Sequence, residues 1–208
     1  MICTVDAVNG DLHLDLNPES TKQVAAADAI VLTKTDVAQV GTVDALSTRL
    51  RNINPSTRFF EAPFGNVDPN ELLRPGWSPD RVSSISAGEV NARHVSRTYS
   101  TSLTFDGPVD WVAFGIWIGM LLHARGEDVL RVQGLLNVLG EVGPVLLNGV
   151  QHVVHPTDHL EEWPDEDHRS RVVFITRGIR PEELLASLEA FRRVIRAGPR
   201  LLETNTPV

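Results

Sequence analysis

The chain has 208 residues, of which 42% are hydrophobic and 22% are charged, and its formal net charge is −8 at pH 7. This composition predicts a soluble globular protein of one large domain or two small ones, and the acidic balance argues against a nucleic-acid partner because phosphate contacts require clustered lysine and arginine. The single cysteine, Cys3, excludes a disulfide framework and a thiolate-rich metal site within one chain, which indicates a reducing, cytoplasmic location.

Neither a signal peptide nor a membrane span is expected. Strand-like sequence follows Met1, where a signal peptide would carry a basic segment and an apolar core. The longest nearly uninterrupted apolar run, from Trp111 to Leu122, is shorter than the ~20 residues that cross a bilayer. We therefore predict that this run is a buried helix.

Residues 1 to about 65 are predicted to alternate strands with helices. Strands are expected at residues 2–5, 29–32 and 58–60, and helices at residues 19–27 and 40–53. In the second helix Val43, Leu46 and Leu50 recur at helical spacing. Alternation of this kind indicates an α/β fold with a parallel sheet and right-handed crossovers.

The second predicted strand, from Ala29 to Leu32, leads directly into Thr33-Lys34-Thr35-Asp36. GTP-binding folds recognise guanine with Lys-x-Asp after such a strand, the carboxylate accepting hydrogen bonds from the N1 and N2 edge of the base. A polar turn after a buried strand is the alternative interpretation. Ligand binding is favoured because open α/β sheets bind their ligands at the carboxyl ends of the strands.

A second motif that GTP-binding folds require is absent from the sequence. The 208 residues contain no Gly-x-x-x-x-Gly-Lys-Ser/Thr loop, whose backbone N–H groups hold the phosphates. The sequence therefore predicts that the chain recognises a base but does not bind the triphosphate.

Residues 66–94 contain several prolines, glycines and serines, and they are predicted to form a linker with one helical turn at residues 70–74. Residues 95–197 are predicted to form a second, α+β unit, and residues 198–208 a tail. Strands are expected in this unit at residues 99–105, 129–138, 145–154 and 171–176, and helices at residues 110–125 and from residue 181 to a stop near residue 198. Two helices on one face of these strands would make a two-layer sandwich.

Histidines and carboxylates gather between residues 152 and 168. Imidazole and carboxylate groups suit zinc or cobalt, so His152 and His155 are the candidate metal ligands. On one extended strand, however, these two side chains would face opposite sides, and a solvated acidic loop is the favoured interpretation. We predict no metal site in this chain.

Several blocks of sequence, in order, resemble the CobW-type P-loop GTPases. The blocks are Thr4-Val5-Asp6-Ala7, Ala27 to Asp36, Arg51 to Pro55, Val129 to Leu136, Leu147 to His152, Trp163-Pro164 and Arg171 to Ile175. Together they extend over residues 4–196, which is almost the whole chain. The resemblance implies part of a GTPase domain with a parallel sheet, followed by a CobW-like C-terminal α+β domain.

The resemblance also implies a GTP-dependent metallochaperone that delivers zinc, cobalt or iron to a client metalloprotein. It assigns Thr33, Lys34 and Asp36 to the recognition of guanine in GTP or GDP, with magnesium as the accompanying ion. Thr33 stands where the family more often has asparagine, whose amide helps to brace the phosphate loop. A threonine hydroxyl supplies part of that function.

The family's phosphate loop, Cys-x-Cys-Cys motif and magnesium-associated acidic residue do not appear in the 208 residues. Phosphoryl transfer depends on the phosphate loop and magnesium, so this chain alone is expected not to hydrolyse GTP. The first 65 residues are expected to pair with the missing N-terminal half or with another copy of the chain. The alternative function is a non-catalytic interaction or regulatory module built on the C-terminal domain.

Overall fold

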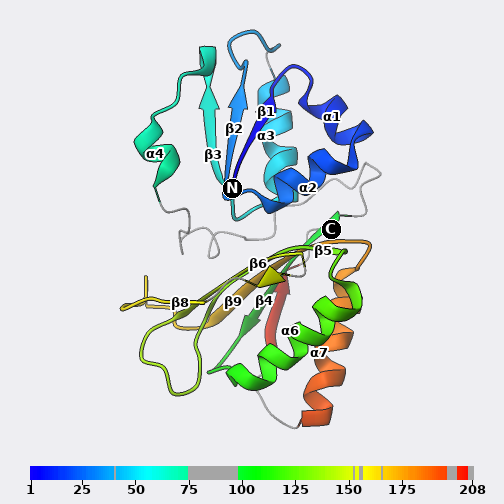
Figure 1. The fold of residues 1–208 in the computed structure, drawn as a ribbon, viewed down its shortest axis with the longest axis vertical. Helices are drawn as coiled ribbons and strands as arrows, with labels where there is room; N and C mark the ends of the chain where they lie inside the picture. Colours follow the sequence, from blue (N-terminus) through cyan, green and yellow to red (C-terminus); the bar gives the residue numbers. More distant parts are fainter. Residues whose placement is uncertain are drawn as a thin grey trace. The chain divides into compact units, whose positions relative to one another are not determined.

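A computed structural model of the chain describes residues 1–39, 41–74, 98–151, 153–154, 157–164, 166–195 and 201–205. Within them the chain forms two compact units, the first in residues 1–74 and the second in residues 98–205 (Figure 1). Each unit has its own sheet and its own helices, so each is described by itself.

The first unit contains a three-stranded parallel sheet in the order β1-β2-β3. The strands are β1 (Ile2–Asp6), β2 (Ala29–Thr33) and β3 (Arg58–Ala62), and the helices are α1 (Gly10–Leu16), α2 (Pro18–Ala26), α3 (Thr42–Ile53), the 3₁₀ turn η1 (Pro63–Gly65) and α4 (Pro69–Leu73). Asp6 pairs in register with Thr33, and Thr33 pairs with Ala62. All three strands therefore end at the same edge of the sheet, which we call the carboxyl edge.

Burial of the apolar central strand β2 stabilises this small sheet. Its first four residues, Ala29 to Leu32, are buried, as expected for an apolar run in a parallel strand with both faces covered. Close packing of α1 adds to this core, because a Cβ atom on Gly10 would lie 2.7 Å from Leu46 of α3 and 2.8 Å from Val5 of β1. Glycine at this position lets α1 begin against the strand.

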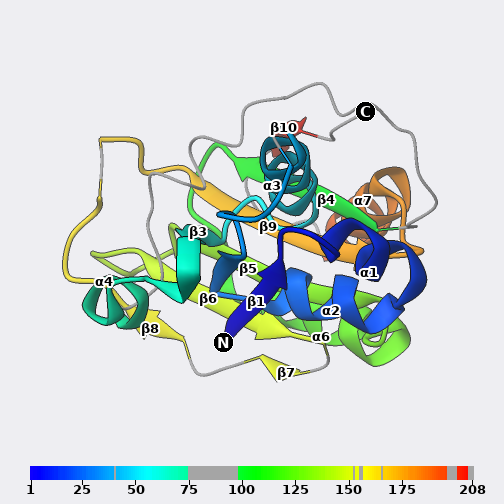
Figure 2. The same cartoon turned by 90° about the horizontal axis from the view of Figure 1, so that it is seen from above.

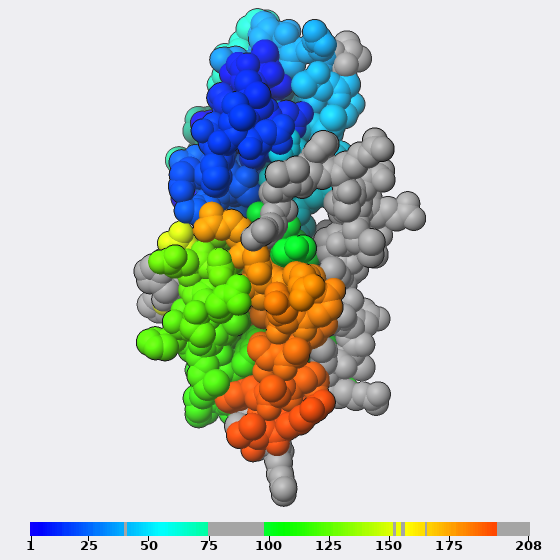
Figure 3. Space-filling model, turned by 90° about the vertical axis from the view of Figure 1, so that its right-hand side faces the viewer, coloured from blue at the N-terminus to red at the C-terminus, as the bar shows by residue number. Residues whose placement is uncertain are grey.

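The second unit is an antiparallel sheet with two long helices on one face (Figures 1 and 2). The strand order is β10-β4-β9-β5-β6-β7, and β8 also pairs with β6. The strands are β4 (Thr98–Phe105), β5 (Val129–Leu136), β6 (Val145–Val150), β7 (Val153–Val154), β8 (Asp158–His159), β9 (Ser170–Arg177) and β10 (Leu201–Asn205), and the helices are α6 (Trp111–Arg125) and α7 (Pro181–Ile195). Figure 3 shows the helical layer from outside, with α6 in green beside α7 in orange.

A single apolar cluster fills the space between the helices and the sheet of this unit. Its aromatic centre is Trp117, whose ring centroid lies 5.6 Å from Phe114 on its own helix and 5.6 Å from Phe174 on β9. The indole Nε1 of Trp117 donates to Ser187 Oγ of α7 at 3.3 Å, which joins the two helices. No helix in the described part of the chain is both long enough and apolar enough to cross a membrane.

The predicted fold class is confirmed, and most predicted elements form within a few residues of their expected ends. Helix α1 and strand β10 had no prediction, and β10 lies inside the predicted tail. The single strand predicted at residues 145–154 is wrong, because Gln151 has φ +53° and β7 folds back onto β6 with Val153 opposite Val150. Much of the predicted linker, from residue 75 onward, lies outside the described residues.

Candidate functional site at the carboxyl edge of the first sheet

The carboxyl edge brings together three loops that lie far apart in the sequence. They follow β1 at Asp6, β2 at Thr33 and β3 at Ala62. Because the strands are parallel and in register, the side chains after each strand meet at one end of the sheet. Of the three residues predicted from the sequence, Thr33 is the last residue of β2, and Lys34 and Asp36 lie in the middle loop that follows it.

Thr33 ties the middle loop to the neighbouring strand. Its Oγ1 donates to the carbonyl of Val5 at 3.2 Å, and its own carbonyl accepts from Ala7 N at 2.9 Å. These two hydrogen bonds join the end of β2 to β1 and to the loop that follows β1.

Lys34 adopts the left-handed backbone conformation, with φ +59°. This conformation is uncommon for a residue with a side chain, and it makes the chain turn sharply at the end of the strand. The carbonyl of Lys34 then accepts from Val37 N and Ala38 N, both at 3.2 Å, which closes the turn around Asp36.

The ammonium group of Lys34 reaches across to the first loop. Its Nζ lies 2.7 Å from Asp6 Oδ2, and the side chains of Lys34 and Asp6 are 58% and 18% exposed. The same aspartate accepts from Val8 N at 2.8 Å and Asn9 N at 3.4 Å through Oδ1, and from Asn9 Nδ2 at 3.2 Å through Oδ2. Partial burial raises the pKa of Asp6, but the hydrogen bonds from Lys34, Val8 and Asn9 outweigh it and lower the pKa to about 2.

Asp36 is joined to the third loop. Its Oδ1 accepts the backbone N–H of Phe64 at 2.9 Å. Phe64 is 89% exposed and has φ +52°, and Gly65 beside it has φ +74°, so the loop after β3 turns tightly around the carboxylate. Asp36 remains exposed, and because a carboxylate has about four acceptor positions, it retains capacity for further donors.

Two residues of this edge, Asp6 and Phe64, had no predicted role. Asp6 ends the first predicted strand in the Thr-Val-Asp-Ala block, which was a usable signal because open α/β sheets place ligands at such strand ends. Phe64 gave no such signal, because its part in the edge is made by a backbone N–H that any residue except proline supplies.

The metal-site prediction falls mostly outside the described residues, since His152 and His155 are not among them. Among the residues that the structure does describe, no group of three or more histidine, cysteine, aspartate or glutamate side chains is placed to hold a metal ion. Cys3 is buried, and burial raises the pKa of its thiol, which disfavours the thiolate that binds metals.

The residues of the carboxyl edge fit the base of a guanine nucleotide better than its phosphates. Asp36 offers an exposed acceptor for the two donors on the N1 and N2 edge, and Lys34, two positions before it, is also exposed. The phosphates and magnesium would need the glycine-rich loop that the sequence lacks. Among the described residues the edge therefore offers an acceptor that matches the donors of a base such as guanine, while the sequence lacks the loop on which phosphoryl transfer depends.

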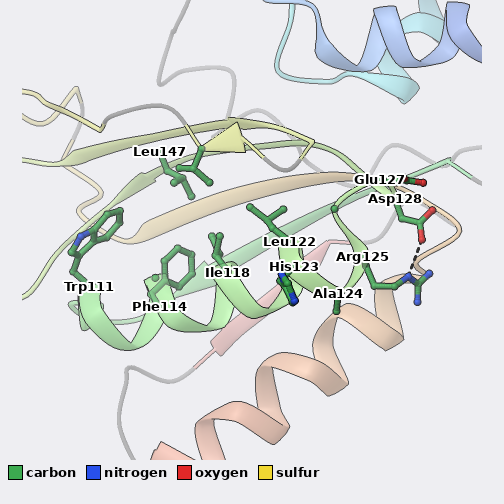
Figure 4. A pocket seen from close by; sticks show the side chains of 14 residues that line it. Trp111, Phe114, Ile118, Leu122, His123, Ala124, Arg125, Glu127, Asp128 and Leu147 are labelled. Carbon is green, nitrogen blue, oxygen red and sulfur yellow. Dashed lines mark hydrogen bonds and ion pairs between the residues drawn. The ribbon is translucent and has the colours of Figure 1, made fainter.

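A separate groove lies along α6 in the second unit, with a volume of about 830 Å³ (Figure 4). Trp111, Phe114, Ile118 and Leu122 line it from the helix, and Leu147 lines it from β6. Its polar groups gather at the C-terminal end of α6, where Arg125 Nε binds Asp128 Oδ2 at 2.8 Å. The groove is therefore apolar along the helix and polar at its C-terminal end.

Comparison with known proteins agrees with this architecture. Residues 1–61 match the CobW/HypB/UreG nucleotide-binding domain, and residues 99–192 match the cobalamin synthesis protein CobW C-terminal domain. The zinc chaperone YjiA of Escherichia coli strain K12 is 30% identical over 196 residues, which cover 93% of this chain and 61% of that protein.

Two solved structures of YjiA share the fold. The Zn(II)-bound YjiA GTPase from E. coli has a TM-score of 0.67 at 28% identity over 92% of this chain and 60% of that one. A Zn(II)-bound triple mutant of the YjiA GTPase has the same TM-score and identity over 91% of this chain and 60% of that one. The chain thus spans about three fifths of the length of the relatives that it matches.

The matched domains, in this order, cover about three quarters of the chain. With the parallel sheet of the first unit and the antiparallel sheet of the second, they lead to one conclusion: the chain belongs to the CobW family, and the zinc chaperone YjiA is a distant relative of it.

Proposed function

We propose that this chain supplies the guanine-recognition site and the C-terminal domain of a GTP-dependent metallochaperone that delivers zinc, cobalt or iron to a client metalloprotein. One observation carries the proposal. Asp36 is exposed at the carboxyl edge, held by the backbone N–H of Phe64, and only two positions from Lys34.

In this proposal Asp36 reads the base. Its carboxylate accepts hydrogen bonds from guanine N1–H and N2–H₂, while the Phe64 N–H keeps Oδ1 in place. The aliphatic stem of Lys34 lies over the ring plane. Adenine lacks both donors at the corresponding positions, so the carboxylate favours guanine.

Phosphate binding and hydrolysis lie outside the proposed role of this chain. Catalysis of phosphoryl transfer comes from a phosphate loop, its lysine and magnesium, and the sequence has no such loop. We therefore propose that the chain alone binds GTP or GDP weakly and does not hydrolyse GTP.

A change of base preference tests this assignment. In Asp36→Asn the amide Oδ1 still accepts N1–H, but Nδ2 now donates, which suits the C2 carbonyl of xanthine and leaves the N2 amino group of guanine unpaired. We expect the variant to lose saturable binding of GDP and to gain binding of xanthosine diphosphate, measured by saturation-transfer NMR. A loss of at least tenfold is expected because hydrogen bonds to charged groups contribute about 1.5–3 kcal/mol each.

The matched control is Asp106→Asn, which removes an exposed carboxylate from the second unit. It should bind GDP as the unchanged chain does. If the unchanged chain binds no GDP, or if Asp36→Asn binds GDP equally well, the guanine-recognition proposal is wrong.

The free edge of β1 supports a proposal about assembly. In the described sheet β1 pairs only with β2, so its other side offers unpaired backbone groups, and Ile2 on this strand is 43% exposed. We propose that this edge receives a further strand, either from the part of the relatives that this chain does not match or from a second copy of the chain.

The groove along α6 supports a second candidate function, a non-catalytic module that binds a protein partner. Val112, Ile116 and Met120 are 69%, 50% and 57% exposed on the same helix, so apolar surface continues beyond the groove. The fitting partner is a client protein that offers an apolar helix. If Ile116→Asp abolishes client binding while Asp36→Asn leaves it unchanged, the module describes this chain better than the nucleotide site does.

A further inference from the structure

The contact between Asp6 and Lys34 joins the ends of β1 and β2, which lie far apart in the sequence. Lys34 Nζ lies 2.7 Å from Asp6 Oδ2, although 28 positions separate the two residues. The contact depends on the register of β1 with β2, which sets Asp6 beside Thr33, and on the left-handed turn at Lys34.

Asp6 is itself firmly held, which makes it a fixed anchor. Three groups besides Lys34 donate to its carboxylate: the N–H of Val8, the N–H of Asn9 and the side-chain amide of Asn9. With both oxygens engaged, the carboxylate has little freedom to rotate. Its side chain is 18% exposed, whereas that of Lys34 is 58% exposed, so the aspartate is the more enclosed partner of the pair.

Holding the end of a lysine side chain lowers the entropy cost of ordering its stem against a ligand. A free lysine side chain samples many rotamers, and part of this freedom is lost when the stem is ordered against a ligand. If the ammonium is already bound at the carboxyl edge, part of this ordering is complete before the ligand arrives.

We propose that Asp6 is a positioning residue that orders Lys34 for its contact with the guanine base. The inference rests on the proposed function, since Lys34 acts there as the stem over the ring. Asp6 acts through Lys34 and does not touch the base. Ordering of one side chain contributes about three- to tenfold in affinity.

The alternative is that Asp6 only shapes the turn at Val8 and Asn9, through the hydrogen bonds it accepts there. A double-mutant cycle separates the two roles. The cycle uses the full chain with Asp6→Asn, Lys34→Met and both changes together, and GDP dissociation constants are measured by NMR titration. Urea unfolding of each variant establishes that it is folded.

We expect Asp6→Asn to weaken GDP binding three- to tenfold in the unchanged chain and less than twofold in the Lys34→Met chain. Asp6→Glu, which retains the negative charge, should recover part of the loss. An equal loss in both backgrounds would assign Asp6 to the turn alone, and no loss in the unchanged chain would overturn the proposal.

A second readout does not need a nucleotide. Carbon relaxation of the Lys34 Cε methylene should show a more mobile side chain in Asp6→Asn than in the unchanged chain. Equal mobility overturns the positioning role whatever the GDP result. If mobility rises as expected but the unchanged chain binds no GDP, the contact stands as a lysine clamp while the proposed function and the role in base binding both fail.

Discussion

At the scale of single residues, the carboxyl edge concentrates backbone conformations that cost free energy. Lys34 and Phe64 both have positive φ although neither is glycine, and the two lie in loops that Asp36 joins. Such conformations cost of the order of 1 kcal/mol each and tend to cluster at binding sites. Hydrogen bonds to the Lys34 carbonyl and from the Phe64 N–H hold them here.

Asp6 should make the stability of the first unit depend on pH. Its pKa is about 2 in the folded chain and about 3.9 when unfolded, so its stabilising contribution is complete above about pH 4 and is lost as pH falls through about 2. We expect Asp6→Asn to lower the free energy of unfolding by about 1 to 2 kcal/mol at pH 7, measured by urea denaturation, with the difference vanishing near pH 2. A pH-independent difference would show that the ionised carboxylate is not the cause.

The sequence predicted part of this site for a physical reason. Thr33, Lys34 and Asp36 are close neighbours in the sequence at the end of β2, so their spacing alone brings them together. The contacts Lys34–Asp6 and Asp36–Phe64 each join residues 28 positions apart. These contacts require the strand register and two left-handed backbone conformations, which composition and periodicity do not specify.

At the scale of elements, the end of α3 is fastened to the end of α2 by one buried side chain. Asn54 is fully buried, and its Nδ2 lies 2.9, 3.0 and 2.9 Å from the carbonyls of Val24, Ala25 and Ala27. Carbonyls at a helix C-terminus have no partner within the helix, so this amide supplies what α2 lacks.

Asn54→Ala should therefore destabilise the first unit by about 2 to 3 kcal/mol, because it leaves buried carbonyls without a donor. The measurement is urea unfolding at pH 7. Asn52→Ala is the matched control, since Asn52 is exposed on the same helix, and it should change stability by less than about 0.5 kcal/mol. Equal effects of the two substitutions would contradict the role given to Asn54.

The elements that escaped prediction share a weak local signal. In α1 the residues Leu12, Leu14 and Leu16 alternate as they would in a strand, and only Leu14 of the three is buried. The reversal after β6 depends on the positive φ of Gln151. A sequence pattern signals such a turn by a glycine, and this position has none. Longer elements such as α6 and α7 were predicted because their apolar residues extend over several helical turns.

At the scale of the whole molecule, the two units differ in how complete their cores are. The first unit holds the proposed guanine-recognition residues in a sheet that has three strands within the described residues, whereas the second has a two-layer core of its own. The relatives extend well beyond the part that this chain matches. We therefore expect the first unit to be the one that needs a partner.

Sedimentation velocity at increasing concentration tests this expectation. We expect the chain to self-associate through the free edge of β1, and Thr4→Lys, which places a charge on that exposed edge strand, to shift it toward monomer. Asn52→Lys adds the same charge away from the edge and should sediment like the unchanged chain. A monomer at every concentration would contradict self-association through this edge.

Amide chemical-shift mapping with GDP tests the central claim most directly. If the carboxyl edge reads guanine, saturable shifts should concentrate in the loop of Thr35 and Asp36 and in the loop of Phe64 and Gly65, with adenosine diphosphate producing none there. Shifts confined to the second unit, or equal shifts with both nucleotides, would contradict the claim.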